Sequence, residues 1–338
     1  MAAAQELRKS APEMTASLPL ALRMWKAYIR PHLGLLFTAM ALMLVAAAMT
    51  GAMAKLMEPV IDKVFTAKDT VMLWPVAGGV FLVFAVRGGA TYGQAVMMNN
   101  LSQRIVSAIQ RDMFAHLVRC DLAFFHSVQS GELMSRFLAD TALIRAAVTE
   151  SLTGFGKNVF TVAFLIGVMF LQDWKLALIS IFVFPAAAYA VVRMTKKLRK
   201  VSTGTQVKMG ELTAMLGQAF QGNRHVKAYG MEEFEKERVN SAVLQIFKLM
   251  TRSFRISAIA TPVAEMLSGL AIVTIIIYGG MQVMAGVSTA GKLFSFIAAF
   301  LLAFEPMKRL ARLNGAMQMG FAALDRLFNL LDMEPTIK

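Results

Sequence analysis

Long apolar segments follow one another along the chain, and the apolar positions within and beyond them recur at helical spacing. Several of these runs approach the roughly 20 residues that a helix needs to cross a lipid bilayer. The pattern therefore predicts an all-α membrane protein with six spans. The predicted helices cover about residues 31–56, 72–117, 132–171, 176–220, 231–284 and 293–331.

The second predicted helix is far longer than a bilayer requires. It begins near Met72, and its pattern continues through the polar stretch Asn99–Asp112 to Leu117. About 45 helical residues measure about 70 Å, whereas the hydrocarbon core is about 30 Å thick. We therefore expect two long hairpins on one side of the membrane, with tips at 121–140 and 217–239, and short connections on the other.

Charge predicts which side is cytoplasmic. Five basic residues within eight positions follow the fourth span, and such clusters mark the inner boundary; they are Arg193, Lys196, Lys197, Arg199 and Lys200. The stretch Leu18–Arg30 is amphipathic and basic, as expected of a helix lying in the membrane interface. Met57–Val71 balances acids with bases and is expected to be an outer loop. Both chain ends are then cytoplasmic.

Composition supports the membrane assignment. The chain is 57% hydrophobic and only 17% charged, against about 25% charged residues in typical globular proteins. Its formal net charge of +14 suits cytoplasmic parts that face anionic headgroups. A nucleic-acid binder would also be basic, but its Lys and Arg would not flank spans. The single Cys120 excludes an internal disulfide and gives no pattern for a metal site.

The tip of the first hairpin is more apolar than a solvated linker. Phe124 and Phe125 form a compact apolar knob, Ser130-Gly131 interrupts the chain, and Glu132 stands where a new helix would begin. Periodicity leaves two interpretations open. The tip either presents apolar side chains to a partner outside the membrane or packs against its own neighbours, and periodicity alone favours the second.

Three dispersed motifs, in the same order along the chain, resemble those of ATP-binding-cassette (ABC) exporters. FFxxxxxGELMSRFxxD, beginning at Phe124, resembles the first intracellular loop of that family. GQAFQGNRHVKAYGMEEFEKERV (217–239) resembles the second coupling region. EPMKRLARLNGAMQMGFAALDRLFNLLDMEP, beginning at Glu305, resembles the sixth helix and its exit towards a nucleotide-binding domain. The resemblance extends over nearly the whole chain, from about residue 18.

The resemblance implies an organisation and partners. Residues 1–16 would be a mobile cytoplasmic tail, 17–30 an interfacial elbow helix, 31–331 the six-helix transmembrane domain and 332–338 the start of a linker. The nucleotide-binding domain would belong to the same full-length chain or to a separate subunit. A second copy of the chain would complete a homodimer in a bacterial inner membrane, and ATP and Mg²⁺ would serve the complete transporter.

In such exporters the hairpin tips hold coupling helices that dock on the nucleotide-binding domain. The positions that match these contacts by resemblance are Ala123, Phe124, Phe125, His126 and Gln129 in the first tip and Gln221, Gly222, Asn223, Arg224 and Lys227 in the second.

Within the family the chain looks most like the MsbA-type flippases of lipid A and phospholipids, whose inner cavity carries basic residues that face lipid phosphates. Arg87, Lys157 and Lys308 match those residues by type, whereas Glu305 stands where a basic residue is expected.

Physical chemistry singles out Arg87 independently. An arginine inside an apolar span costs several kcal/mol unless it faces a cavity or a partner, and the same rule applies to Glu265 beside Pro262. Structural pairs, Arg87–Glu265 or Lys308–Glu305, are the alternative to substrate binding. Snorkelling to the inner headgroups is a further alternative for Lys157 and Lys308.

The chain lacks the sequence features of an ATPase. It contains no G-x-x-x-x-G-K-[ST] phosphate-binding loop, and its four histidines show no catalytic arrangement with carboxylate and serine. We therefore expect no catalytic residue, metal site or cofactor in this chain. The resemblance implies ATP-driven movement of an amphipathic lipid from the inner to the outer leaflet. Alternatives are a multidrug or peptide ABC exporter and, in another class, a proton-driven carrier that uses Glu265 and Glu305.

Overall fold

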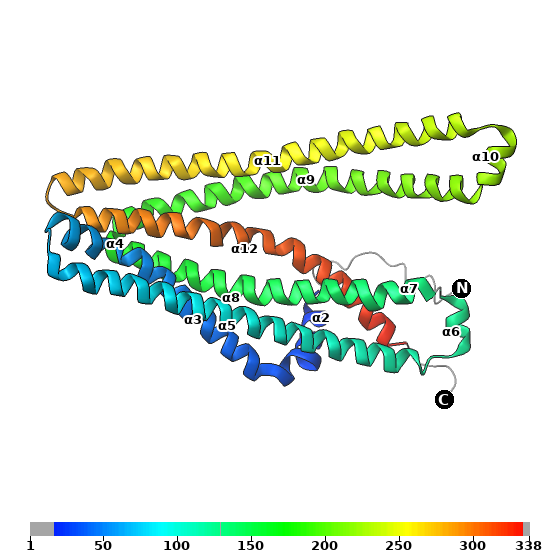
Figure 1. The fold of residues 1–338 in the computed structure, drawn as a ribbon, viewed down its shortest axis with the longest axis horizontal. Coiled ribbons are helices and arrows are strands. Elements are labelled where there is room, and N and C mark those ends of the chain that lie inside the picture. Colours follow the sequence, from blue (N-terminus) through cyan, green and yellow to red (C-terminus); the bar gives the residue numbers. More distant parts are fainter. Residues whose placement is uncertain (1–16, 129, 334–338) are drawn as a thin grey trace. The chain divides into compact units, whose positions relative to one another are not determined.

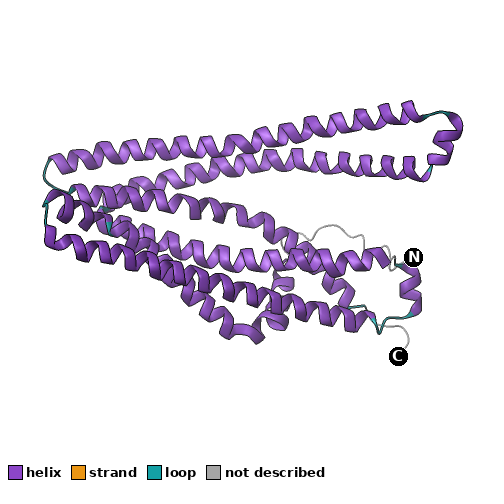
Figure 2. Cartoon of the chain, viewed as in Figure 1, coloured by secondary structure: helices purple, strands orange, loops and turns teal. Residues whose placement is uncertain are grey.

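The computed structural model of the protein describes residues 17–128 and 130–333. Every regular element in these ranges is a helix, and no strand occurs there (Figure 2). The chain divides into two compact units, one formed by Met1–Ala177 with Gly279–Lys338 and the other by Leu178–Tyr278. Some helical side chains lie outside the described part, at positions 123, 127, 181–192, 194–196, 199, 200, 260, 261, 264, 311, 312, 314 and 316.

The first unit begins with the predicted elbow. Helix α2 (Ser17–Met24) leads into the π-helical turn η1 (Trp25–Ile29) and the 3₁₀ turn η2 (Arg30–His32). Pro31 in η2 has no N–H to continue the helical ladder, so the chain redirects there before α3 (Leu33–Lys55) begins. The first span thus starts two residues later than expected.

The prediction that Met57–Val71 forms a loop is wrong for most of these residues. Helix α4 (Met57–Pro59) and the π-helical turn η3 (Val60–Thr66) continue the rod after α3, and only 67–69 lie outside helices. The balanced charges, read as a solvated loop, are compatible with an exposed helix. The carboxylate of Asp69 then accepts hydrogen bonds from the N–H groups of Val71 (2.9 Å) and Met72 (3.3 Å) and starts α5.

Helix α5 (Thr70–Leu117) runs without interruption for 48 residues, which confirms the predicted overshoot. Helices α6 (Leu122–Ser127), α7 (Ser130–Ser135) and the π-helical turn η4 (Arg136–Asp140) form the hairpin tip. Helix α8 (Thr141–Gln172) returns (Figure 1). The first hairpin therefore has the predicted form, with a break between two long helices.

Helix α12 (Ala290–Leu331) packs along α8 and closes the core of the first unit. The approach is close because Gly320 has no side chain: a Cβ there would lie 2.1 Å from the Cβ of Ala147. The largest fully buried side chains of this unit come from α3, α5, α8 and α12, and include Met43, Met98, Leu101, Ile105, Ile144, Phe296 and Phe300.

The second unit is a long hairpin of its own. Helix α9 (Trp174–Gln221) starts in the first unit at an Asp173-capped turn, and α11 (Glu232–Met284) returns to it. The short helix α10 (Asn223–Tyr229) forms the tip. It ends at Gly230, whose φ of 62° suits glycine because a Cβ would be strained there. The predicted break at 221–223 is confirmed.

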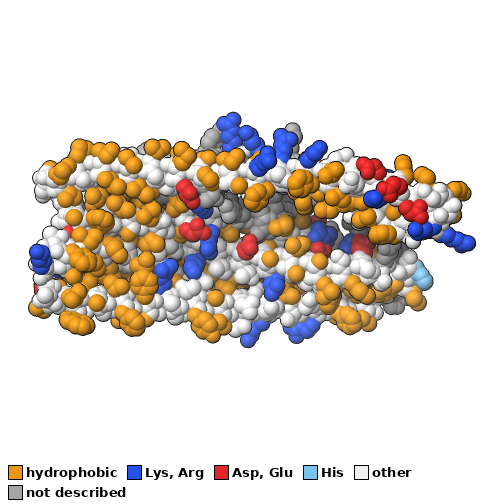
Figure 3. All heavy atoms as spheres, turned by 45° about the horizontal axis from the view of Figure 1, so that its top comes forward, with side chains coloured by type: hydrophobic (Ala, Val, Ile, Leu, Met, Phe, Trp, Pro, Cys, Tyr) orange, Lys and Arg blue, Asp and Glu red, His pale blue; other side chains and the backbone are white. Residues whose placement is uncertain are grey.

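Five helices in the described part are long and apolar enough to cross a membrane. They correspond to the first, second, third, fifth and sixth predicted spans. The predicted fourth span falls largely on residues 181–192 of α9, whose side chains lie outside the described part. On the face seen in Figure 3, hydrophobic side chains crowd the helices near the short turns, and many charged ones lie nearer the hairpin tips.

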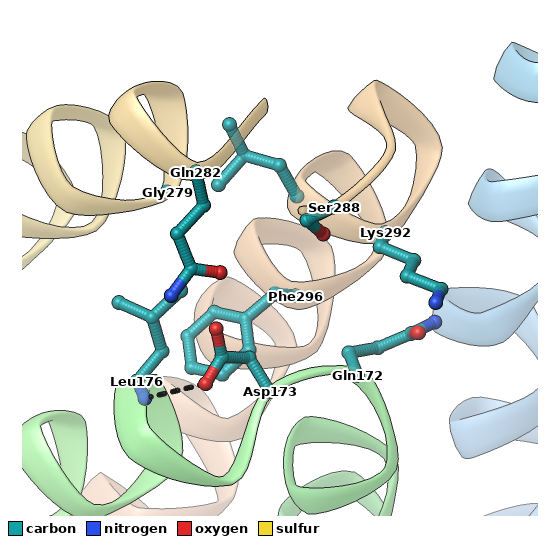
Figure 4. A pocket seen from close by; sticks show the side chains of 9 residues that line it. Gln172, Asp173, Leu176, Gly279, Gln282, Ser288, Lys292 and Phe296 are labelled. Atoms are coloured by element: carbon teal, nitrogen blue, oxygen red, sulfur yellow. Dashed lines mark hydrogen bonds between the residues drawn. The ribbon is translucent and has the colours of Figure 1, made fainter. Parts of the chain in front are cut away.

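Polar contacts tie α4 and η3 to the end of α8 and the start of α12. Asp62 accepts hydrogen bonds from Thr289 Oγ1 and from the N–H of Gly291 (2.7 Å) at the start of α12. Gln172 at the end of α8 donates to Glu58 (2.9 Å) and to Ser295 (2.7 Å). The adjoining cavity (Figure 4) measures about 10 Å³ and holds at most a water molecule, so it is no lipid site.

Candidate functional site

Three basic side chains from three helices form the centre of the candidate substrate site. Arg87 on α5 is half-buried, and its Nη1 lies 3.8 Å from the Sδ of Met53 on α3. Lys157 on α8 is half-buried and experiences the positive charges of both Arg87 and Arg309 of α12. We refer to Arg87, Lys157 and Arg309 as the basic cluster, because the charges of Arg87 and Arg309 both act on Lys157, and its role in substrate binding stays a prediction.

Only one carboxylate of the described residues forms an ion pair with this basic cluster of Arg87, Lys157 and Arg309. Glu305 Oε1 lies 3.3 Å from Arg309 Nε one helical turn away, and both side chains are largely exposed. Glu305 therefore pairs with Arg309 rather than with Lys308. The ammonium of Lys308 instead lies 4.5 Å from the centroid of the Phe304 ring, a cation–π distance. The cluster keeps an excess of positive charge.

Glu265, the remaining predicted site residue, belongs to the second unit. It is exposed on α11, three residues after Pro262. None of the ion pairs among the described residues includes it. The alternative pairing of Glu265 with Arg87 would join the two units, and the role of Glu265 stays a prediction.

The tip of the first hairpin combines a buried and an exposed aromatic ring. The rings of Phe124 and Phe125 meet edge to face with centroids 5.4 Å apart. Phe124 packs against the core of the first unit, whereas Phe125 and His126 are exposed. Phe124 thus packs against its own neighbours, and contact of Phe125 with a partner stays a prediction. The side chain of Ala123 and all of Gln129 lie outside the described part.

Two ion pairs involve this tip, one within it and one that connects it to α12. Arg136 is buried and its Nη2 lies 2.7 Å from Glu132 Oε1, one turn before it. Asp140 accepts two hydrogen bonds from Arg326 of α12, at 2.6 and 3.0 Å. This forked geometry fixes both the distance and the orientation of the two planar groups. The end of the tip is thereby fastened to α12.

The tip of the second hairpin is open to solvent. Of the predicted contact residues, Gln221, Asn223, Arg224 and Lys227 are exposed and Gly222 is half-buried. Lys227 lies 2.9 Å from Glu232, and its hydrogen bond lowers the pKa of that carboxyl group. Two aromatic rings are exposed here, Phe220 near the end of α9 and Tyr229 at the end of α10. The tip offers apolar and basic groups together.

Comparison with known proteins decides the family. The model of the ABC transporter transmembrane region matches residues 36–307. The chain belongs to this family. Curated relatives agree: the ATP-dependent lipid A-core flippases of Syntrophus aciditrophicus and Desulfotalea psychrophila are 37% and 36% identical over 91% and 90% of the chain. An uncharacterized ABC transporter ATP-binding protein of Sinorhizobium fredii is 32% identical over 86%.

The chain spans about half the length of these curated relatives, covering 51%, 53% and 50% of them. It therefore matches the part of an ABC transporter that lies in the membrane. Among the described residues no group of three or more His, Cys, Asp or Glu side chains could hold a metal ion.

Sequence reasoning missed Arg309 as part of this transmembrane region's basic cluster. It stands in the run Lys308-Arg309, and periodicity could not tell which of the two faces α8. It also missed the Asp140–Arg326 pair, whose members are 186 positions apart. Arg326 lies in the AALDRLF motif and Asp140 ends the GELMSRFxxD motif, so each carried a signal, but only packing pairs them.

Proposed function

We propose that the chain is the membrane-spanning half of an ATP-driven exporter that moves an amphipathic lipid with phosphate groups from the inner to the outer leaflet. The observation that carries this proposal is the cluster of Arg87, Lys157 and Arg309, contributed by α5, α8 and α12. Two of these side chains are half-buried, and Glu305 alone among the described carboxylates pairs with the cluster.

Physical chemistry favours an anionic ligand at this cluster. Cations held near one another in an apolar span repel, and each loses hydration that the protein must replace. A lipid phosphate supplies the missing negative charge and accepts charge-assisted hydrogen bonds from arginine and lysine. The acyl chains of the same molecule would find apolar helix surface around the cluster. An uncharged drug would leave the cations uncompensated.

The relatives support the same substrate class. Two of those most similar to the chain are named ATP-dependent lipid A-core flippases. We extend to this chain the use of ATP and the lipid cargo. Glu305 stands where a basic residue is expected from the resemblance. Its negative charge reduces the positive charge near Arg309, and we propose that this difference affects which lipid the chain selects.

The mechanism proposed is alternating access in a homodimer. Nucleotide-binding domains, in the same full-length chain or as separate subunits, would bind ATP with Mg²⁺ and dock on the tips at α6 and α10. ATP binding favours the closed state of those domains and so shifts the population towards an outward-facing cavity. The long α5, α8, α9 and α11 would carry the movement through the membrane, and the transporter would lie in a bacterial inner membrane with six spans.

The Arg87→Ala variant of the complete transporter tests the cargo. Losing one charge-assisted contact should raise the lipid concentration for half-maximal stimulation of ATP turnover about tenfold. Basal turnover should stay within about twofold. The measurement is ATPase activity in vesicles with increasing lipid A or phospholipid. Arg145→Ala removes an exposed charge from α8 and serves as the matched control.

Equal loss of basal and stimulated turnover would assign Arg87 a structural role and would remove the main support for the proposal. Arg87→Lys keeps the charge and should retain most of the stimulation, which separates charge from folding defects. Transport that collapses with an uncoupler while ATP is abundant would instead favour the proton-driven carrier.

A further inference from the structure

A polar groove lies far from the basic cluster of Arg87, Lys157 and Arg309, where the elbow meets α5. It measures about 510 Å³ and is lined by His32, Asn100, Gln103, Arg104, Ser107 and Arg111. His32 comes from η2, and the other five come from α5. Arg104 lies 17 residues beyond Arg87 along α5, about 25 Å at the helical rise. The groove is therefore a separate site.

The five α5 residues form one continuous stripe. Counted from Asn100, they occupy positions i, i+3, i+4, i+7 and i+11, which share a face of an α-helix. Every one of them can donate a hydrogen bond, from an amide, a hydroxyl or a guanidinium group. A stripe of donors on a single face suits a ligand that is rich in acceptor oxygens.

The positive charge of the groove is not compensated by the described part of the chain. No carboxylate in residues 17–128 and 130–333 forms an ion pair with Arg104 or Arg111 there. Arg111 uses its Nε for the carbonyl oxygen of Ser107 at 3.2 Å. Its neighbour Asp112 accepts from the Tyr28 hydroxyl at 2.9 Å. The terminal nitrogens of both guanidinium groups thus remain available.

The elbow sets the depth and the shape of this groove. The Tyr28–Asp112 hydrogen bond fastens η1 to α5, and Tyr28 is buried. His32 follows at the corner where the interfacial helix turns into the first span. Its Nδ1 is buried and has no partner among the described residues. Headgroups of the inner leaflet lie at the level of such a corner.

We propose that this groove binds the phosphate headgroup of an anionic phospholipid of the inner leaflet, held by Arg104 and Arg111 against His32. Arginine forks match phosphate oxygens, and Asn100, Gln103 and Ser107 supply neutral donors around them. The bound lipid would stay beside the elbow during transport and is not the cargo. The groove's residues are open to solvent as well, so free inorganic phosphate is the rival occupant.

Quenching of Trp25 by brominated lipid tests the proposal in the complete transporter. This sequence has three tryptophans, so Trp74→Phe with Trp174→Phe leaves only Trp25 of η1 in it, and any tryptophan elsewhere in the complete transporter is also replaced by phenylalanine. The transporter is placed in vesicles with brominated phosphatidylglycerol or brominated phosphatidylcholine. The ratio of the two quenching curves gives the relative affinity of lipid sites beside the elbow.

We expect phosphatidylglycerol to be preferred, with each arginine contributing about fivefold. Arg104→Gln with Arg111→Gln should bring the relative affinity close to one. Arg119→Gln with Arg145→Gln removes two exposed charges elsewhere and should leave the preference unchanged. Arg104→Lys with Arg111→Lys should keep part of it, which provides a charged variant if the glutamine pair does not fold.

Three results would overturn the assignment. The wild type could show no preference, or the glutamine pair could keep the wild-type preference. Replacement of chloride by inorganic phosphate at equal ionic strength should leave the lipid preference in place; its loss would make the groove a site for soluble phosphate. None of these readouts involves ATP turnover, so failure here is distinguishable from failure of the proposed transport function.

Discussion

At the scale of residues, the contact between the elbow and the end of α12 stands out. Arg23 donates to both carboxylate oxygens of Asp332, at 2.6 and 2.5 Å, and its guanidinium lies 4.2 Å from the centroid of the Phe328 ring. About half of each ion-pair side chain remains exposed, 46% and 52%. Solvent screening therefore keeps its contribution below about 1 kcal/mol.

The Asp332→Asn variant should loosen the elbow at neutral pH. The hydrogen bond from Arg23 holds the pKa of Asp332 below its ordinary range, so its stabilisation is present above about pH 3.9 and is lost as pH falls through the lowered pKa. Amide hydrogen exchange over residues 17–30 should be up to about fivefold faster in the variant at pH 7. The ratio of the exchange rates of variant and wild type should approach one in acid. A ratio that does not change with pH would contradict a stabilising role of the Arg23–Asp332 ion pair.

Two residues show how much of the candidate site could be predicted from the sequence. Arg87 is detectable because an isolated charge in an apolar run is costly and must have a partner. Arg309 is not detectable in this way, since it stands in an amphipathic run where charge is ordinary. Its significance comes from the packing of α12 beside α8, which no local pattern specifies.

At the scale of elements, the packing of α12 on α8 depends on one missing side chain. Gly320 lies so close to Ala147 that an added Cβ would overlap it, at 2.1 Å. Gly315, on the same helix, has open space around its Cα, with no atom within 4 Å of an added Cβ. The two glycines therefore offer a matched comparison of close packing and helix propensity.

The Gly320→Ala variant should lose about 1–3 kcal/mol through overpacking, seen as an apparent Tm several degrees lower in detergent. Gly315→Ala should be neutral or stabilising, because alanine is the better helix former. Ala147→Gly added to Gly320→Ala should restore much of the loss by removing the other methyl group. If the double variant is no more stable than Gly320→Ala, this contact does not limit the approach of the two helices.

Helix ends were predictable where a local signal specified them. The predicted starts of α5 and α11, at Met72 and Met231, differ from the observed ones by two residues and by one residue, and Asp69 and Gly230 stand at these two junctions. The loop prediction for residues 57–71 was wrong because balanced charges and a proline such as Pro59 are typical of a loop. Proline is tolerated at the first turn of a helix, and the segment docks on α12, so tertiary contact decided its form.

At the scale of the whole molecule, the topology rests on whether α9 crosses the membrane. With six spans, the tip at α10 is cytoplasmic and the connection at Val287 is outside. Without a crossing by α9, the tip would be outside and Val287 inside. Both positions are exposed, Tyr229 at 77% and Val287 at 75%, so each can report its side.

Cysteine labelling distinguishes the two topologies. After Cys120→Ser removes the only cysteine, Val287→Cys should react in intact cells with a maleimide that cannot cross the inner membrane. Tyr229→Cys and the control His126→Cys should react only after lysis. Labelling of Tyr229→Cys from outside would exclude the six-span arrangement.

The bond between Arg23 and Asp332 also has a mechanical consequence. It joins the helix that we predict to lie in the membrane interface to the point where α12 ends. A thicker or thinner bilayer displaces interfacial helices, and here the displacement would be passed to the segment after Asp332. The thickness of the membrane would thereby become an input to the segment that follows α12, delivered without passage through the proposed transport pathway.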